Sequence, residues 1–129
     1  MFTGYYSKLK KYLDAGLYPV SIALYAPDCY HGIEYKKLAP KLQFFNEWKN
    51  GSHKGDNDYY IREFSAQVLN KLDAFAVVSE LEKLTGVDDS KIILLCYEKP
   101  KDFCHRHLVA NWLTRYSFET KEFSITKNR

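Results

Sequence analysis

The sequence predicts an α/β fold, in which one three-layer domain over residues 1–129 has a mainly parallel sheet flanked by helices. Residues 92–96 form an uninterrupted apolar run, which is typical of a strand buried on both faces of a parallel sheet. Residues 19–25 form a second such run. Segments with apolar residues at helical spacing surround both runs, and 129 residues suffice for one hydrophobic core.

The N-terminal part of the chain is expected to alternate strand, helix and strand. Residues 1–3 predict a short first strand, and Thr3-Gly4 predicts a turn into a helix that Gly16 ends. The apolar run at residues 19–25 then predicts an inner strand. The residues that share the apolar face of the first helix are Tyr5, Leu9, Tyr12 and Leu13.

The middle of the chain predicts three helices. Pro40 suits the first turn of a helix that continues to Trp48. An exposed loop is expected at 50–58, followed by a helix over 58–72. Asp73 is expected to cap a third helix that ends near Gly86. The residues expected to point inward from the last two helices are Tyr60, Ile61, Phe64, Val68, Leu72, Phe75, Val78, Leu81 and Leu84.

The C-terminal part carries the predicted central strand and the best site candidates. The strand spans 91–97, and Asp102 is a reasonable N-cap for the helix after it. Residues 104–106, Cys-His-Arg, then occupy the first helical turn, beyond the carboxyl end of the strand. Residues 121–125 alternate in polarity and predict an edge strand.

The position of Cys104 predicts a reactive thiol. A helix N-terminus favours anions and thiolates, and Arg106 adds a charged fork of donors suited to phosphate or carboxylate. Loops that leave the carboxyl ends of neighbouring parallel strands converge. We therefore expect Glu98, Cys104 and Arg106 to line one pocket, opposite Gly4 or the loop 26–32.

Composition excludes several classes of protein. A hydrophobic content of 46% and a charged content of 27% are ordinary for a globular chain. The net charge of +3 is too small to indicate nucleic-acid binding by itself. No apolar run approaches the ~18 residues of a membrane span, and no signal peptide is recognised. We therefore expect a cytoplasmic protein with no membrane partner.

Three cysteines without a paired short spacing do not predict a disulfide scaffold. Cys96 and Cys104 flank the end of the strand. We expect the start of the following helix to face an open rim, so that Cys104 is the most acidic cysteine. Cys96, inside the strand, is expected to be inert. Asp28, Cys29 and His31 are metal-capable side chains, but three of them in one loop without a fourth ligand are weak support for a metal centre. We therefore expect no metal and no cofactor.

Two motifs resemble the domain of unknown function 488 family. They are Leu94-Leu95-Cys96-Tyr97-Glu98, which contains Cys-x-Glu, and Cys104-His105-Arg106 at the start of a helix. The resemblance extends upstream to residues 21–25, 35–40 and 69–73 and therefore covers most of the chain. It implies a compact α/β fold and a Cys/Glu/Arg pocket, without an established reaction.

Three functions fit these residues. The first is an enzyme for a small anionic or nucleotide-like substrate, in which Arg106 holds the anion, Glu98 is general acid or base, and Cys104 is nucleophile or thiolate ligand. The second is a non-catalytic module for a nucleotide or a nucleic-acid end, whose pocket Tyr5, Tyr30 and the Lys54 loop would widen. The third is structural, with Glu98 paired to Arg106. The residues expected to contact a ligand are Gly4, Tyr5, Tyr30, His105 and Arg106.

Overall fold

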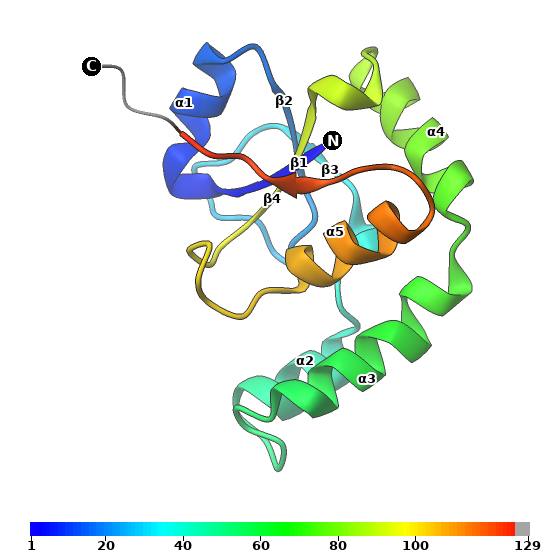
Figure 1. Ribbon diagram of the computed structural model, residues 1–129. Helices are drawn as coiled ribbons and strands as arrows, with labels where there is room; N and C mark the ends of the chain where they lie inside the picture. The colour runs from blue at the N-terminus through cyan, green and yellow to red at the C-terminus, as the bar shows by residue number, and fades with distance from the viewer. Residues whose placement is uncertain (126–129) are drawn as a thin grey trace.

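The structure is a computed structural model that describes residues 1–125, and its centre is a sheet of five strands (Figure 1). The strand order is β3-β2-β4-β1-β5, and each neighbouring pair is parallel. The central position of β4 and the parallel sheet are as the sequence predicts. The strands are β1 (Phe2–Tyr5), β2 (Tyr18–Ser21), β3 (Ile33–Glu34), β4 (Ile92–Cys96) and β5 (Lys121–Glu122).

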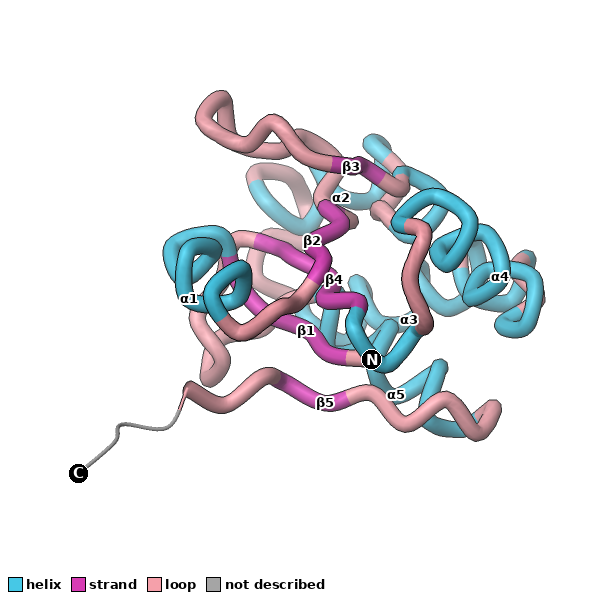
Figure 2. The backbone as a smooth tube through the Cα atoms, turned by 90° about the horizontal axis from the view of Figure 1, so that it is seen from above, coloured by secondary structure: helices cyan, strands magenta, loops and turns pink. Residues whose placement is uncertain are grey.

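Helices cover both faces of this sheet. Figure 2 shows α1 on one side of the strands and α3, α4 and α5 on the other, which is the predicted three-layer arrangement. None of the helices within residues 1–125 is both long and apolar enough to cross a membrane. The helices are α1 (Leu9–Asp14), α2 (Leu42–Lys49), α3 (Asn57–Gln67), α4 (Ala74–Thr85) and α5 (His105–Arg115).

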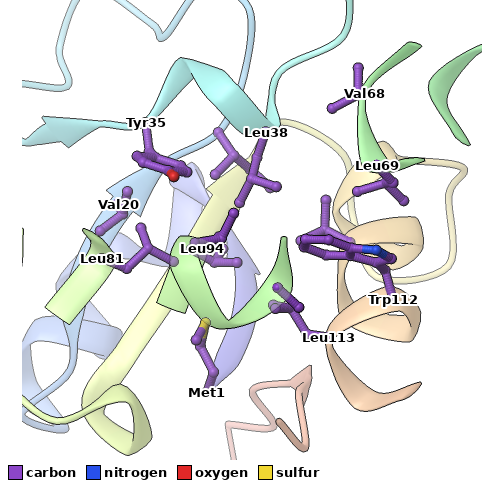
Figure 3. Packing of buried hydrophobic residues seen from close by; sticks show 14 of the residues in the cluster. Met1, Val20, Tyr35, Leu38, Val68, Leu69, Leu81, Leu94, Trp112 and Leu113 are labelled. Atoms are coloured by element: carbon purple, nitrogen blue, oxygen red, sulfur yellow. The ribbon is translucent and has the colours of Figure 1, made fainter. Parts of the chain in front are cut away.

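β4 is buried on both faces along its whole length. Ile92 and Leu94 belong to the larger apolar cluster, which they share with side chains from α2 to α5 (Figure 3). Ile93 and Leu95 pack instead with Tyr12 of α1. Each aliphatic side chain buried in this way contributes ~1.5–3 kcal/mol. A register slip of one residue would exchange the two faces, so this burial holds β4 in one position.

Several predicted boundaries in the strands and in α1 are wrong. Tyr5 completes β1, and α1 begins only at Leu9, after a 3-10 turn. Leu13, predicted on the apolar face of this helix, is exposed. β2 ends at Ser21 instead of Tyr25, because its pairing with both β3 and β4 ends at that residue. The predicted edge strand exists as β5, shortened to two residues.

The helices in the middle of the chain exist as predicted, with shifted bounds. The predicted end of α3 at residue 72 is wrong, because α3 ends at Gln67 and a separate 3-10 turn follows at Leu69–Lys71. Pro40 lies outside α2, whose N-cap is the next residue. Asp56 caps α3 by accepting the Tyr59 N–H at 3.1 Å, so this helix begins before Asp58. Asp73 caps α4, and Gly86 ends it with a φ of 75°, both as expected.

Three of the residues predicted to point inward are exposed. They are Ile61 on α3 and Phe75 and Leu84 on α4. A helix that packs on one layer buries only a stripe of its surface, and these side chains lie beside that stripe. Phe75 contacts Phe118 near the surface, with ring centroids 5.1 Å apart.

Truncating β4 tests the two-sided burial of this strand. We expect Leu94→Ala to lower the free energy of unfolding by ~2–5 kcal/mol, because a cavity remains between β4 and the helices. The matched control is Leu84→Ala, whose parent side chain is 51% exposed and should change stability by less than ~0.5 kcal/mol. Urea unfolding measures both values, and equal losses would contradict the central placement of β4.

Candidate functional site

A cavity of about 530 Å³ opens beyond the carboxyl end of β4. Its volume lies within the ~300–1,000 Å³ that is usual for small-molecule sites, and its place agrees with the rule that ligands bind beyond the carboxyl ends of parallel strands. Of the predicted site residues, Glu98, Cys104 and His105 line it. The other lining residues are Ala23, Leu24, Tyr25, Pro40, Phe45, Trp48, Lys49, Lys54, Gly55, Tyr60, Cys96, Tyr97 and Phe103.

Aromatic side chains from three parts of the chain form the wall opposite the sheet. The Trp48 ring of α2 lies 5.1 Å from Tyr60 of α3 and 5.6 Å from Phe103, measured between ring centroids. Tyr60 and Phe103 are 5.1 Å apart, and Phe45 is 6.3 Å from Trp48. Aromatic pairs of this kind contribute ~0.5–1.5 kcal/mol beyond their burial. The wall is therefore a fixed apolar surface suited to a flat ring.

Three charged side chains lie where the cavity meets solvent. Lys49 and Lys54 are exposed and come from α2 and from the loop after it. The Lys49 ammonium lies over the Phe45 ring, 5.4 Å from its centroid. Glu98 is exposed in the loop that follows β4. Cations therefore outnumber anions at this opening.

The two thiols and the imidazole of Cys96, Cys104 and His105 form the floor, and we call these three residues the thiol–imidazole cluster. Their sulfur and nitrogen atoms lie within 4.8 Å of one another. Cys96 ends β4, whereas Cys104 is the N-cap of α5. The predicted N-cap Asp102 is wrong, because its N–H donates to Lys99 O at 3.0 Å and closes a turn in the preceding loop.

The two nitrogens of His105 face different partners. Nε2 lies 2.7 Å from the carbonyl oxygen of Ile22, in the segment after β2. A carbonyl oxygen only accepts, so Nε2 carries the hydrogen of this bond. Nδ1 lies 3.6 Å from the sulfur of Cys96. The bond to Ile22 thus points the second nitrogen at the thiols.

Cys104 is acidic although it is buried. Contact with the Cys96 thiol, and after it with His105, lowers the pKa of Cys104 against the opposing effect of burial. The same contact with Cys104, together with burial, raises the pKa of Cys96. These directions favour the expectation that Cys104 is the most acidic cysteine, which stays a prediction. The expected open rim is wrong, because Cys104 is 5% exposed.

Residues 21–117 match the model of a protein family described as DUF488-N3a, the active DUF488-N3 subclade. The matched segment contains β3, β4, α2 to α5 and the whole cavity lining, but only the last residue of β2. The chain belongs to this DUF488 family. The resemblance seen in the two sequence motifs is therefore confirmed. No curated protein and no solved structure matches the chain.

Arg106 of the DUF488 motif does not share the cavity with Glu98 and Cys104, so that expectation is wrong. Its Nε and Nη2 atoms each donate to a carboxylate oxygen of Glu122 at 3.0 Å. The Arg106 side chain is fully buried, and Glu122 also accepts from the Thr3 hydroxyl at 2.7 Å. The structural alternative, in which Arg106 pairs with Glu98, is also wrong, because the edge strand supplies the carboxylate.

Gly4, Tyr5 and Tyr30 also lie outside the cavity lining. A Cβ on Gly4 would come within 2.6 Å of the Tyr12 ring, so this glycine makes room for Tyr12. The Tyr5 N–H donates to the Tyr12 hydroxyl at 3.1 Å. Tyr30 is buried and donates to Ile33 O at 2.7 Å. The wall opposite the motif comes from α2 and α3, not from Gly4 or the loop 26–32.

Sequence reasoning missed most of the cavity wall. Phe45 and Trp48 were assigned only to a helix, and Tyr60 to the core, although one signal was available: the chain is rich in aromatic residues on both sides of the loop 50–58. Within residues 1–125, the loop carrying Cys29 does not bring three metal-capable side chains together. Cys29 itself is exposed.

The partner of Arg106 can be identified by comparing two carboxylate variants. We expect Glu122→Ala to lower the free energy of unfolding by ~3–5 kcal/mol, because it leaves a buried guanidinium unpaired. Glu98→Ala should change it by less than ~0.5 kcal/mol, since Glu98 is an exposed loop residue. Chemical denaturation of both variants gives these values. A larger loss for Glu98→Ala would restore the structural alternative, in which Glu98 pairs with Arg106.

Proposed function

We propose that this protein is an enzyme that acts on a nucleotide, or on another small anionic ligand with a flat ring, in the cavity beyond β4. The observation that carries the proposal is one cavity with aromatic walls, two lysines at its opening and, at its floor, a cysteine whose pKa is lowered. The description of the family's subclade as active agrees with a catalytic role.

The aromatic wall supplies the affinity for a flat ring. Stacking of a base on an aromatic side chain contributes ~1–3 kcal/mol, and it tolerates different bases because every base has a π-face. Trp48 and Phe103 are both partly exposed lining residues, so their rings are accessible from the cavity. We propose these two side chains as the stacking surface.

Lys49 and Lys54 take the anion-binding role that the sequence had suggested for Arg106. Two donors of Arg106 are already bound to Glu122, whereas both lysines are exposed at the opening of the cavity. An ammonium group binds phosphate as a point charge and needs no fixed geometry. A nucleotide would therefore lie with its phosphate outward and its reacting atoms toward the floor.

Cys104 and Glu98 are the proposed catalytic residues. Cys104 supplies a thiolate, as a nucleophile or as a thiolate ligand, and Glu98 moves a proton as general acid or base. Both roles of Cys104 require reduced thiols, and the three cysteines of the chain are free. We accordingly propose a reducing, cytoplasmic setting for the protein.

Ligand binding is tested first, by a thermal-shift screen of nucleoside monophosphates, nucleosides and sugar phosphates. A ligand that binds the folded protein raises the unfolding midpoint by mass action. We expect nucleotides to raise it more than nucleosides, which lack the phosphate, or sugar phosphates, which lack the ring. No shift with any of the three sets at millimolar concentration would overturn the proposal.

Lysine variants test the placement of the phosphate. We expect Lys49→Ala combined with Lys54→Ala to weaken nucleotide binding about tenfold, equivalent to ~1.4 kcal/mol, and to leave nucleoside binding unchanged. Lys83→Ala on α4 is the control, because Lys83 is exposed and outside the cavity lining. Titration calorimetry compares the three proteins. An equal loss for nucleoside and nucleotide would place the phosphate elsewhere.

Conversion of each bound ligand, followed by chromatography and mass spectrometry, separates an enzyme from a binding module. We expect Cys104→Ser to abolish conversion and Glu98→Gln to lower kcat by ~10²–10⁴-fold, the usual contribution of acid–base catalysis. Cys29→Ser should keep full activity, since Cys29 is exposed and outside the lining. Binding without product in the unmodified protein would favour the non-catalytic module.

A further inference from the structure

We propose that the thiol–imidazole cluster of Cys96, Cys104 and His105 binds one Zn²⁺ ion at the floor of the cavity. Two cysteines and a histidine are a donor set that Zn²⁺ prefers, and soft thiolates disfavour Mg²⁺ and Ca²⁺. This inference revises the expectation of no metal. Binding of the metal does not depend on the proposed function. Its use in catalysis rests on that function, and there Cys104 acts as a thiolate ligand instead of a nucleophile.

The separations within the cluster fit a tetrahedral ion. With Zn–S bonds of ~2.3 Å and Zn–N bonds of ~2.0–2.1 Å, tetrahedral angles place sulfur and nitrogen ligands about 3.5 Å apart and two sulfurs about 3.8 Å apart. Cys96 Sγ and His105 Nδ1 are 3.6 Å apart. All three ligand atoms lie within 4.8 Å of one another, so an ion between them requires only small side-chain movements.

The hydrogen bond of His105 is an independent observation that points to a ligand. Histidines that bind metals usually donate the hydrogen of their other ring nitrogen to a carbonyl or a carboxylate, which orients the ring. Here Nε2 donates to Ile22 O at 2.7 Å, so in the neutral ring Nδ1 presents its lone pair to the thiols. This imidazole is 4% exposed and is therefore held in place.

The cluster leaves a coordination position that faces the cavity. All three residues line the cavity, and they supply three of the four ligands of a tetrahedral ion. Sites with three protein ligands and one open position are those in which Zn²⁺ takes up water or substrate, whereas structural sites have four protein ligands. A Zn²⁺ ion here would meet the reacting part of a ligand held between the aromatic walls.

Metal content is measured on the whole protein without any substrate. The protein is purified under reducing conditions, treated with a chelator, and titrated with Zn²⁺ and separately with Co²⁺. We expect one Zn²⁺ per chain and a higher unfolding midpoint with Zn²⁺ than without it. Bound Co²⁺ should show a thiolate-to-cobalt charge-transfer band and the intense visible absorption of a tetrahedral ion.

Cysteine variants assign the ligands. Cys96→Ser and Cys104→Ser should each lower the Zn²⁺ affinity by more than the ~10–100-fold that loss of an outer hydrogen-bond partner costs. Cys29→Ser is the matched control and should bind one Zn²⁺ with unchanged affinity, because Cys29 is exposed and outside the cluster. Circular dichroism without metal shows whether each variant folds.

If a variant does not fold, alkylation of the unmodified protein still tests whether Cys96 and Cys104 bind Zn²⁺. Zn²⁺ should protect Cys96 and Cys104 from iodoacetamide and leave Cys29 reactive, as read by peptide mass spectrometry. The inference is overturned if the protein binds no Zn²⁺, if protection falls on Cys29, or if Cys96→Ser and Cys104→Ser bind as well as the control. None of these results bears on nucleotide binding, so the two proposals can fail separately.

Discussion

The burial of β4 on both faces is the constraint on which the rest of the structure depends. Its side chains alternate between two apolar clusters, and a shift by one residue would send each of them to the wrong cluster. The strand is paired on both sides, with β1 and with β2, so its end is held as well as its middle. Cys96 is therefore presented at a defined point, beside the Tyr5 end of β1 and next to the start of the cavity.

The Cys-His-Arg motif divides between the cavity and the fold. Consecutive residues at a helix start point in different directions, so neighbours in sequence contact different parts of the protein. Cys104 and His105 meet Cys96 at the floor, whereas Arg106 turns to the edge strand and binds Glu122. Arg106 thereby ties α5 to β5 and, through the Thr3 bond to Glu122, to β1. This anchor holds the start of α5, and with it Cys104, in position.

A buried thiolate requires compensation for the water that it loses. In this protein a neighbouring thiol and an imidazole provide it, so the pKa of Cys104 falls although the sulfur is enclosed. Aromatic side chains line the same cavity, and electrostatic interactions are stronger in apolar surroundings than in water. The proposed chemistry and the proposed metal binding both use the two thiols and the imidazole that line this cavity.

The sequence by itself determined the elements that depend on local patterns. An unbroken apolar run identified β4 as the central strand, Asp73 and Gly86 marked the ends of α4, and the two cysteine motifs located the site and its family. These features follow from burial, capping and spacing within a few residues. They are the same in the folded protein because each depends on residues close together in the sequence.

Only the tertiary structure decided which distant groups meet. Glu98 is closer to Arg106 in the sequence, yet Glu122 pairs with it, because β5 docks beside β1 and brings that carboxylate to the guanidinium. The wall formed by Trp48 and Tyr60 likewise depends on how α2 and α3 pack together at the carboxyl end of the sheet. The spacing of apolar residues indicates which face of a helix is buried. The surface against which that face packs depends on the arrangement of the other elements.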